Sequence, residues 1–300
     1  MDTTNLLKNT VDVVNRDDFA QLLKNNRPLR VKVGFDPTRP DLHLGHLVLL
    51  KKMRQFQDLG HTVVLIVGDF TAMVGDPTGK NKARPKLTRK QILDSASTYT
   101  QQASIVLDPK RTEVRFNSEW LSKLKMQDVV SIASRITMDQ ILARRDFRER
   151  INKDQNIFIH EAIYPILQGY DSIAVNADIE LGGTDQLFNL LMGRQMMSLW
   201  RMTPQVIMTL PLLVGTDAHF ENGKIVGQKM SKSLDNYIGL TEDAETIRNK
   251  ILSLEKPVAC EFAKLLSEDS ELINTCLSQD SSLDIRPRIA DELIKYLHKG

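Results

Sequence analysis

The apolar residues near the start of the chain follow the periods of a strand, a helix and a second strand. Residues 30–36, RVKVGFD, are short and rich in valine, as is typical of a β-strand. In residues 44–59, the spacing of Leu49, Met53 and Phe56 at i, i+4 and i+7 predicts one face of a helix. The run HTVVLIVGDF then predicts a fully buried strand. This succession predicts a βαβ unit and therefore a parallel sheet.

The rest of the pattern is mostly helical. We predict further strands at 113–117 and 205–214, and an exposed loop in the basic segment 77–90. Helical periodicity or composition extends over residues 91–107, 118–170 and 240–300. The order of elements predicts an α/β fold.

Composition narrows the class of protein. The chain has 300 residues, of which 41% are hydrophobic and 26% charged, so it can bury a large core. A net charge of +2 gives no general attraction to nucleic acid, and any RNA contact must come from local patches. Two cysteines predict no disulfide framework. We find no secretory signal and no apolar run long enough for a membrane span, and expect a cytoplasmic protein.

The segment DPTRPDLHLGH, residues 36–46, lies at the expected turn from strand to helix, where ligands bind in open α/β sheets. A helix N-terminus offers free amide groups and a partial positive charge, which attract phosphate. His43 and His46 are three residues apart and could both donate hydrogen bonds to phosphoryl oxygens. Gly45 would let a base or ribose approach the backbone. Two surface histidines at a helix start are an equally good explanation of this motif alone.

A second motif, QKMSKSLDN at residues 228–236, contains Lys229 and Lys232. Ammonium groups suit a pyrophosphate whose charge rises in a transition state, although a solvated basic loop is the ordinary alternative. HLGH and KMSKS, roughly 180 residues apart, together resemble the paired signatures of the class I aminoacyl-tRNA synthetases.

Three further segments resemble the tyrosyl-tRNA synthetases of bacteria. They are YPILQGYD at 164–171, LGGTDQLFN at 181–189 and VGDPTGK at 74–80, and the resemblance extends over most of the chain to about residue 240. It implies activation of L-tyrosine by ATP, brought with Mg²⁺, followed by transfer of the tyrosyl group to tRNA(Tyr). We see no dedicated carboxylate cage for a metal in the sequence.

The resemblance assigns roles to individual residues. Those that bind tyrosine are Asp76, Tyr164, Gln168, Asp171 and Gln186, with Asp171 accepting the phenol hydroxyl. Those that act on the phosphates of ATP are Thr38, His43, His46, Lys80, Arg84, Lys229 and Lys232. Those that contact ATP or the adenylate are Asp36, Gly45, Gly183, Asp185 and Lys232.

The residue types agree with the tyrosine site. Tyr164, Gln168 and Asp171 stand at i, i+4 and i+7, so one helical face would carry an aromatic ring, an amide and a carboxylate. A carboxylate and an amide suit an ammonium group, and a buried carboxylate suits a phenol hydroxyl. A plain wet helix face is the alternative. The sequence departs from the family pattern at Lys32, where many relatives have Tyr, and at Val33, where Cys is common.

The resemblance also implies an organisation for the whole chain. We expect a Rossmann-like parallel sheet in a catalytic domain at 1–235, with a helical connective insertion at about 115–165. We expect residues 236–300 to be the start of an anticodon-binding part that is truncated here. In this family the insertion forms a two-fold interface, so we expect a homodimer. Apolar residues of the insertion are Trp120, Ile132, Met138, Ile141 and Leu142.

Three alternatives remain open at this level. A tryptophanyl-type synthetase would share the fold, but LGGTDQLFN argues against it. A nucleotidyltransferase that does not use tRNA can carry an HLGH-type motif, but it would need neither KMSKS nor the tyrosine, glutamine and aspartate stripe. A catalytically inactive binding or regulatory protein would not need the motif histidines and lysines.

Overall fold

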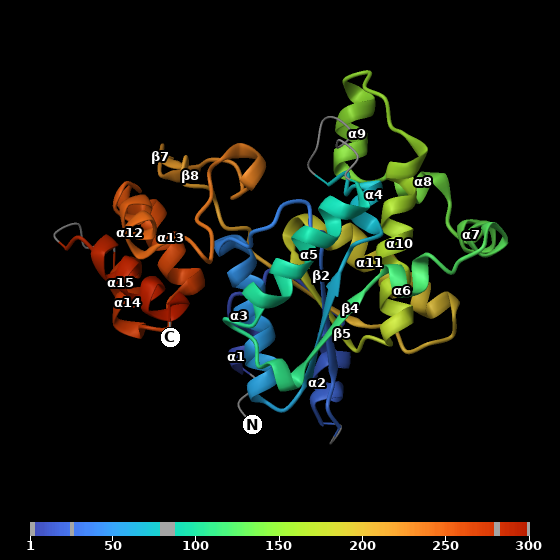
Figure 1. Cartoon of the computed structure of the whole chain (residues 1–300), viewed down its shortest axis with the longest axis horizontal. Coiled ribbons are helices and arrows are strands. Elements are labelled where there is room, and N and C mark those ends of the chain that lie inside the picture. The colour runs from blue at the N-terminus through green and yellow to red at the C-terminus, as the bar shows by residue number, and fades with distance from the viewer. Residues whose placement is uncertain (1–3, 25–26, 79–87, 279–282, 299–300) are drawn as a thin grey trace. The chain divides into compact units, whose positions relative to one another are not determined.

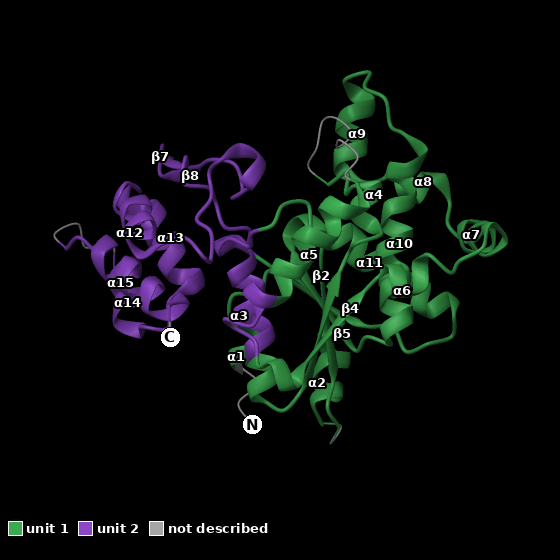
Figure 2. Cartoon of the chain, viewed as in Figure 1, with its two compact units in different colours: residues 1–40, 55–100, 108–210 green, residues 41–54, 101–107, 211–300 purple. Residues whose placement is uncertain are grey.

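The computed structural model describes residues 4–24, 27–78, 88–278 and 283–298. The chain forms two compact units, which Figure 2 shows in different colours. Unit 1 comprises residues 1–40, 55–100 and 108–210, and unit 2 comprises residues 41–54, 101–107 and 211–300. The division into a catalytic domain at 1–235 and a helical region at 236–300 stays a prediction.

Unit 1 is built on a six-stranded sheet with the order β1-β6-β5-β2-β3-β4, in which only β1 runs antiparallel to its neighbour. The strands are β1 (Val13–Val14), β2 (Arg30–Phe35), β3 (Thr62–Val67), β4 (Thr112–Phe116), β5 (Ile179–Gly183) and β6 (Val206–Leu210). Apolar side chains of β2, β3, β5 and β6 are buried, as the valine-rich runs require.

The predicted strands at 30–36 and 113–117, the buried run that contains β3 and the late strand that contains β6 are confirmed. The sequence analysis gave no strand at 179–183, although β5 lies at the centre of the sheet between β2 and β6. This segment is short and ends in two glycines, so it lacks the β-branched composition that marks β2 and β3.

Helices surround the sheet and connect its strands, as Figure 1 shows. The helix predicted at 44–59 is confirmed as α3 (Leu44–Asp58), in which Met53 and Phe56 are fully buried. The other helices of this part of the chain are α1 (Thr4–Leu7), α2 (Arg16–Lys24), α4 (Thr71–Val74), α5 (Arg89–Ala103), α10 (Ile159–Val175) and α11 (Leu187–Leu199).

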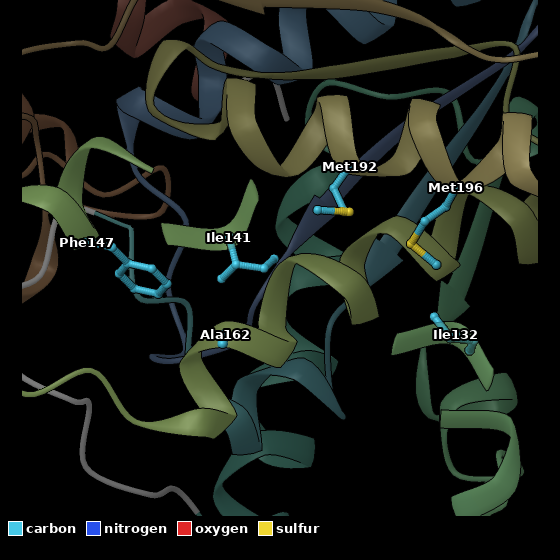
Figure 3. Packing of buried hydrophobic residues seen from close by; sticks show 6 residues of the cluster. All are labelled: Ile132, Ile141, Phe147, Ala162, Met192 and Met196. Carbon is cyan, nitrogen blue, oxygen red and sulfur yellow. The ribbon is translucent and has the colours of Figure 1, made fainter. Parts of the chain in front are cut away.

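The segment between β4 and α10 is helical, as predicted for the connective insertion. It contains α6 (Ser118–Leu121), α7 (Met126–Ala133), α8 (Met138–Leu142) and α9 (Arg145–Asn152). These helices bury a cluster against α10 and α11, which Figure 3 shows as sticks: Ile132, Ile141, Phe147, Ala162, Met192 and Met196. Of the apolar residues that the sequence analysis named in the insertion, Ile132 and Ile141 therefore belong to an internal core.

Unit 2 contains the first part of α3, a small hairpin and a group of helices. The hairpin consists of β7 (His219–Glu221) and β8 (Lys224–Val226), and the helices are α12 (Ala244–Leu252), α13 (Lys256–Leu266), α14 (Ser270–Leu277) and α15 (Arg286–Leu297). The hairpin turns at Asn222 and Gly223, both with positive φ. Asn-Gly is a strong hairpin signal that the sequence analysis passed over. Within the described residues, no helix combines the length and apolar character needed to span a bilayer.

A close approach of two helices sets a requirement for glycine in unit 1. A Cβ at Gly169 of α10 would lie 3.2 Å from the backbone nitrogen of Gly193 in α11 and 2.6 Å from the Met196 sulfur. Gly169→Val should therefore lower the free energy of unfolding by about 1–3 kcal/mol, because the helices must move apart.

Ala174→Val is the matched control, since Ala174 is an exposed residue of the same helix. It should change stability by less than about 1 kcal/mol, through helix propensity alone. Urea unfolding of both variants checks this, and equal losses would contradict the packing argument.

Candidate functional site

The middle strand β2 brings three residues of interest to one face of the sheet. Side chains alternate along a strand, so Lys32, Gly34 and Asp36 follow one another on the same side. Gly34 is exposed although its strand is central, and a Cβ there would meet no atom within 4 Å. Open space therefore begins near the carboxyl end of β2, the edge where parallel sheets bind ligands.

Asp171 of α10 is a buried carboxylate with two fixed donors. Trp120 Nε1 donates to its Oδ1 at 2.8 Å, and Asn117 Nδ2 donates to its Oδ2 at 3.3 Å. Burial raises the pKa of Asp171 to about 7, while the charge of Lys32 and the two hydrogen bonds act in the opposite direction. The Asp171 carboxyl therefore titrates at much higher pH than an exposed aspartate, because two neutral donors and one positive charge only partly offset its burial.

A chain of hydrogen bonds joins Asp171 to Asp36. The Tyr164 hydroxyl donates to Asp36 Oδ2 at 3.0 Å, and Thr71 Oγ1 donates to Asp36 Oδ1 at 2.7 Å. Asn117 Nδ2 also donates to Thr71 Oγ1 at 2.9 Å, so the amide of Asn117 connects both carboxylates. Sequence reasoning found Asp36, Tyr164 and Asp171 but gave Asn117 and Thr71 no role.

A second network surrounds Asp76. Gln186 Nε2 donates to Asp76 Oδ2 at 2.9 Å, and the Thr78 amide donates to Asp76 Oδ1 at 2.9 Å. Asn189 Nδ2 donates to Gln186 Oε1, and the buried Arg144 donates to both Asn189 Oδ1 and Thr78 Oγ1. The structure therefore brings together the predicted pair Asp76 and Gln186, supported by an arginine that the sequence did not reveal.

The remaining predicted residues of unit 1 lie near these networks in the chain. Gln168 is half-buried on α10, one turn from both Tyr164 and Asp171. Gly183 ends β5, and Asp185 lies in the 3-10 turn (Thr184–Gln186) that follows. Thr38 follows β2, with its amide bonded to the carbonyl of Asp36.

In unit 2, the two motif histidines cap the start of α3. The Nδ1 atom of His46 accepts from the backbone N–H of His43 at 3.2 Å, and the Nδ1 atom of His43 accepts from the N–H of Gly45 at 3.1 Å. Both imidazoles thus accept a backbone N–H at the start of α3, as in a capping box except that the His43 ring bonds the amide of Gly45 rather than that of His46. Because both Nδ1 atoms accept, both rings must carry their proton on Nε2 when neutral.

The expectation of free amides at this helix start was wrong. Besides the two capped N–H groups, the amide of Leu44 donates to the Ile238 carbonyl, and that of His46 donates to the His43 carbonyl. The first turn therefore has its donors occupied, and a phosphate would be met by imidazole Nε2–H groups instead.

The positive charges of Lys229 and Lys232, in the second motif, contribute to the low pKa values of His43 and His46. Burial lowers the pKa of His43 well below its usual value, and burial lowers that of His46 to about 3. The charges of Lys229 and Lys232 add to both effects. The four residues thus share one positively charged environment in which the imidazoles remain neutral donors.

The lysine motif is anchored by its own buried residues. Met230 is buried, and its amide donates to the Leu213 carbonyl at 2.8 Å. Asn236 is also buried, accepts from the amide of Ser231 at 2.7 Å and donates to Asp217 at 2.8 Å. These contacts fix the backbone on both sides of Lys232.

Two of the predicted residues, Lys80 and Arg84, lie outside the described residues. Throughout the described ranges, no group of three or more His, Cys, Asp or Glu residues is arranged to hold a metal ion.

Comparisons with known proteins all identify tRNA synthetases of class I as similar to this chain. The family model described as tRNA synthetases class I (W and Y) matches residues 24–299. A tyrosine–tRNA ligase of Haemophilus influenzae is 47% identical over 98% of this chain and 72% of its own length. One of Thermotoga maritima is 45% identical over 98% of this chain and 73% of its own length.

The fold has solved counterparts. The tyrosyl-tRNA synthetase of Archaeoglobus fulgidus, solved in complex with L-tyrosine, superposes with a TM-score of 0.78 at 23% identity, covering 99% of this chain and 98% of that one. That of Aeropyrum pernix gives 0.78 at 20% identity, covering 98% of this chain and 91% of that one. This similarity concerns the fold, and it agrees with the predicted mixed α/β architecture.

The capping geometry predicts the protonation state of the histidines. Because burial and the two lysine charges lower both pKa values, His43 and His46 should stay neutral with the proton on Nε2 from mildly acidic to alkaline pH. Nitrogen-15 correlation spectra of the imidazoles measure this directly. In the urea-unfolded chain the same rings should titrate near about 6.5. A folded-state signal from a protonated Nδ1 in either ring would contradict the capping geometry.

Proposed function

Because this chain belongs to the class I tRNA synthetases, in the family of tyrosine–tRNA ligases, we propose that it activates L-tyrosine with ATP and transfers the tyrosyl group to tRNA(Tyr). The observation that supports the choice of amino acid best is the buried carboxylate of Asp171, held by Trp120 and Asn117.

Tyrosine would be recognised at both ends in unit 1. Asp171 would accept the phenol hydroxyl, and phenylalanine would be rejected because it leaves this buried acceptor without a partner. Asp76, Tyr164 and Gln168 would bind the ammonium group. Gln186, which contacts Asp76 in this structure, would turn to the tyrosine carboxylate when the ammonium replaces it.

The first step would join tyrosine to the nucleotide. The tyrosine carboxylate attacks the α-phosphorus of ATP, the bond to the bridging oxygen breaks, and pyrophosphate leaves. No side chain needs to act as nucleophile or base here, so the protein contributes positioning and charge stabilisation. Nε2–H groups of His43 and His46 and the ammonium groups of Lys229 and Lys232 would meet the phosphates. The acyl group would then pass to the terminal adenosine of tRNA.

Further residues complete the proposal. Thr38, Asp36, Gly45, Gly183 and Asp185 would contact ATP or the adenylate. Lys80 and Arg84 would contact pyrophosphate. Mg²⁺ would enter with ATP as part of the substrate. We further propose that the enzyme acts in the cytoplasm and that residues 236–300 begin an anticodon-binding region.

The substrate assignment has a direct test. Exchange of pyrophosphate into ATP should depend on L-tyrosine and be far weaker with phenylalanine or tryptophan. Asp171→Ala should reduce the preference for tyrosine over phenylalanine by about tenfold or more, since it removes a hydrogen bond to a charged group, and should change the KM for ATP little. Glu113→Gln on the edge strand β4 is the control and should keep the preference. Equal exchange with phenylalanine in the unmodified protein would refute the proposal.

We also propose a homodimer formed by the helical insertion. Its surface carries large exposed apolar side chains: Met126 (78% exposed), Val130 (59%), Met138 (60%) and Ile159 (81%). Of the residues named from sequence, Met138 alone is in this set, and Trp120 is instead bonded to Asp171. An apolar surface of this kind is typical of a subunit interface.

A charge in this surface should dissociate the dimer. Val130→Glu should shift the mass measured by light scattering at micromolar concentration from that of a dimer to that of a monomer, because a carboxylate would be desolvated in the interface. Leu277→Glu, at a similarly exposed apolar position of α14, should leave the dimer intact. A monomer mass for the unmodified protein would contradict the proposed assembly.

A further inference from the structure

Beneath the proposed tyrosine site lies an ion pair that the reaction described above does not use. Lys32 of β2 and Glu180 of β5 are directly paired across the two strands, and their charged atoms are 2.8 Å apart. Their side chains are 0% and 1% exposed. Both residues lie in the middle of a parallel sheet, where apolar side chains are the rule.

The ammonium group of Lys32 has a partner for each of its protons. Besides Glu180, it donates to Ser172 Oγ at 2.8 Å and to the Gln168 carbonyl at 3.3 Å. Ser172 in turn donates to Glu180 at 3.0 Å, and Gln205 donates to the same carboxylate. The cluster is therefore polar and offers an acceptor to each proton of the ammonium group, so a lysine, with three donors, fits it.

Stability alone does not explain this cluster. Replacing a buried ion pair by apolar residues of similar volume is often neutral or stabilising, because desolvation offsets the attraction. The packing around the cluster is also tight: a Cβ at Gly193 would lie 2.9 Å from Gln205 Nε2 and 2.9 Å from Ser172 Oγ. The fold accommodates two buried charges here although an apolar pair would satisfy the sheet.

The position of the cluster suggests its use. Gln168 and Ser172, the two α10 residues bonded to Lys32, enclose the turn of helix that carries Asp171. Lys32 thus holds this turn against β2. Its charge also favours the ionised form of Asp171, whereas the charge of Glu180 disfavours it.

We propose that Lys32 and Glu180 are positioning residues for tyrosine recognition, which hold the Asp171 turn of α10 on the sheet and place a buried pair of opposite charges behind it. This inference rests on the proposed function, in which ionised Asp171 accepts the phenol hydroxyl. In the described part of the chain, neither Lys32 nor Glu180 forms a hydrogen bond with Asp171, and neither is proposed to contact the substrate. They would therefore act by fixing the position of Asp171 and by influencing its ionisation.

Charged and hydrogen-bonding groups from several neighbouring elements act on the Asp171 carboxylate. Lys32 comes from β2 and Glu180 from β5, and both are charged. The segment after β4 contributes the neutral donors Asn117 and Trp120. Asp36 is linked to Asp171 by hydrogen bonds through Thr71 and Asn117, and it is also bonded to Tyr164 of α10.

The two members of the pair should shift tyrosine binding in opposite directions. Tyrosine binds ionised Asp171, so its Kd rises as the pH falls through the pKa of that carboxyl, which is about 7. Lys32→Met removes the charge that lowers this pKa, and the rise in Kd should begin at higher pH. Glu180→Gln removes the charge that raises it, and the rise should begin at lower pH. A shift of one unit changes the Kd about tenfold on the acidic side.

Equilibrium dialysis of L-tyrosine without ATP, across neutral pH, measures these midpoints. Glu161→Gln is the matched control, because Glu161 forms another buried ion pair, with Arg150, on the same helix α10. It should lower thermal stability without moving the midpoint. If Lys32→Met fails to fold, the double variant Lys32→Met with Glu180→Gln leaves no unpaired buried charge, and its midpoint should lie above that of Glu180→Gln.

Different outcomes would refute the proposed function and the role of the Lys32–Glu180 pair. Failure of the unmodified protein to bind or exchange tyrosine would refute the proposed function itself. Normal binding by the unmodified protein, with midpoints of Lys32→Met and Glu180→Gln that move in the same direction or do not move, would overturn the inference and leave the pair a structural element. Opposite shifts, with Glu161→Gln unchanged, would support it.

Discussion

A carboxylate removed from water must find donors or become neutral, and this requirement organises unit 1. Asp171 of α10 is buried beside the parallel sheet, and the segment after β4 and strand β2 each supply part of its compensation, as hydrogen-bond donors and as a positive charge. The compensation is incomplete, which leaves the pKa of Asp171 near neutrality. A buried carboxylate whose burial is only partly compensated is suited to prefer tyrosine, which brings a hydroxyl donor, over phenylalanine.

Hydrogen bonding also determines the state of the two histidines in unit 2 that we propose to contact phosphate. His43 and His46 use one ring nitrogen each to complete the helix start, and that contact directs the proton to the other nitrogen. Burial keeps both rings neutral by lowering their pKa values, and the charges of Lys229 and Lys232 add to this effect. A short motif thus yields two donors of defined tautomer, which a pair of unconstrained surface histidines would not provide.

Much of the fold could be predicted from the sequence, and the elements that were missed have physical reasons for being missed. The periodicity around Val33, Met53 and residues 62–67 was strong enough to place β2, α3 and β3, because each element buries one regular face or run. Strand β5 was not predicted, because its two glycines have low strand propensity. Its place in the sheet is decided by tertiary pairing with β2 and β6.

For the site, the motif residues Asp76 and Gln186 are hydrogen-bonded to each other in the structure, and their role in binding tyrosine stays a prediction. Asn117 and Arg144 were not found, because their roles depend on partners distant in sequence and leave no local pattern. Lys32 was noticed only as a departure from the family. Its burial and its pairing with Glu180 needed the structure, since a single lysine in a strand is usually taken for an exposed or edge position.

Calorimetric titration of tyrosine in buffers of different ionisation enthalpy tests the central claim most directly, because it counts the protons exchanged on binding. Because burial raises the pKa of Asp171 to about 7, tyrosine binding at pH 7 should release a fraction of a proton per site, as the phenol stabilises the ionised carboxylate. Phenylalanine should release none. The absence of proton release with tyrosine, or the same release with both amino acids, would contradict the account.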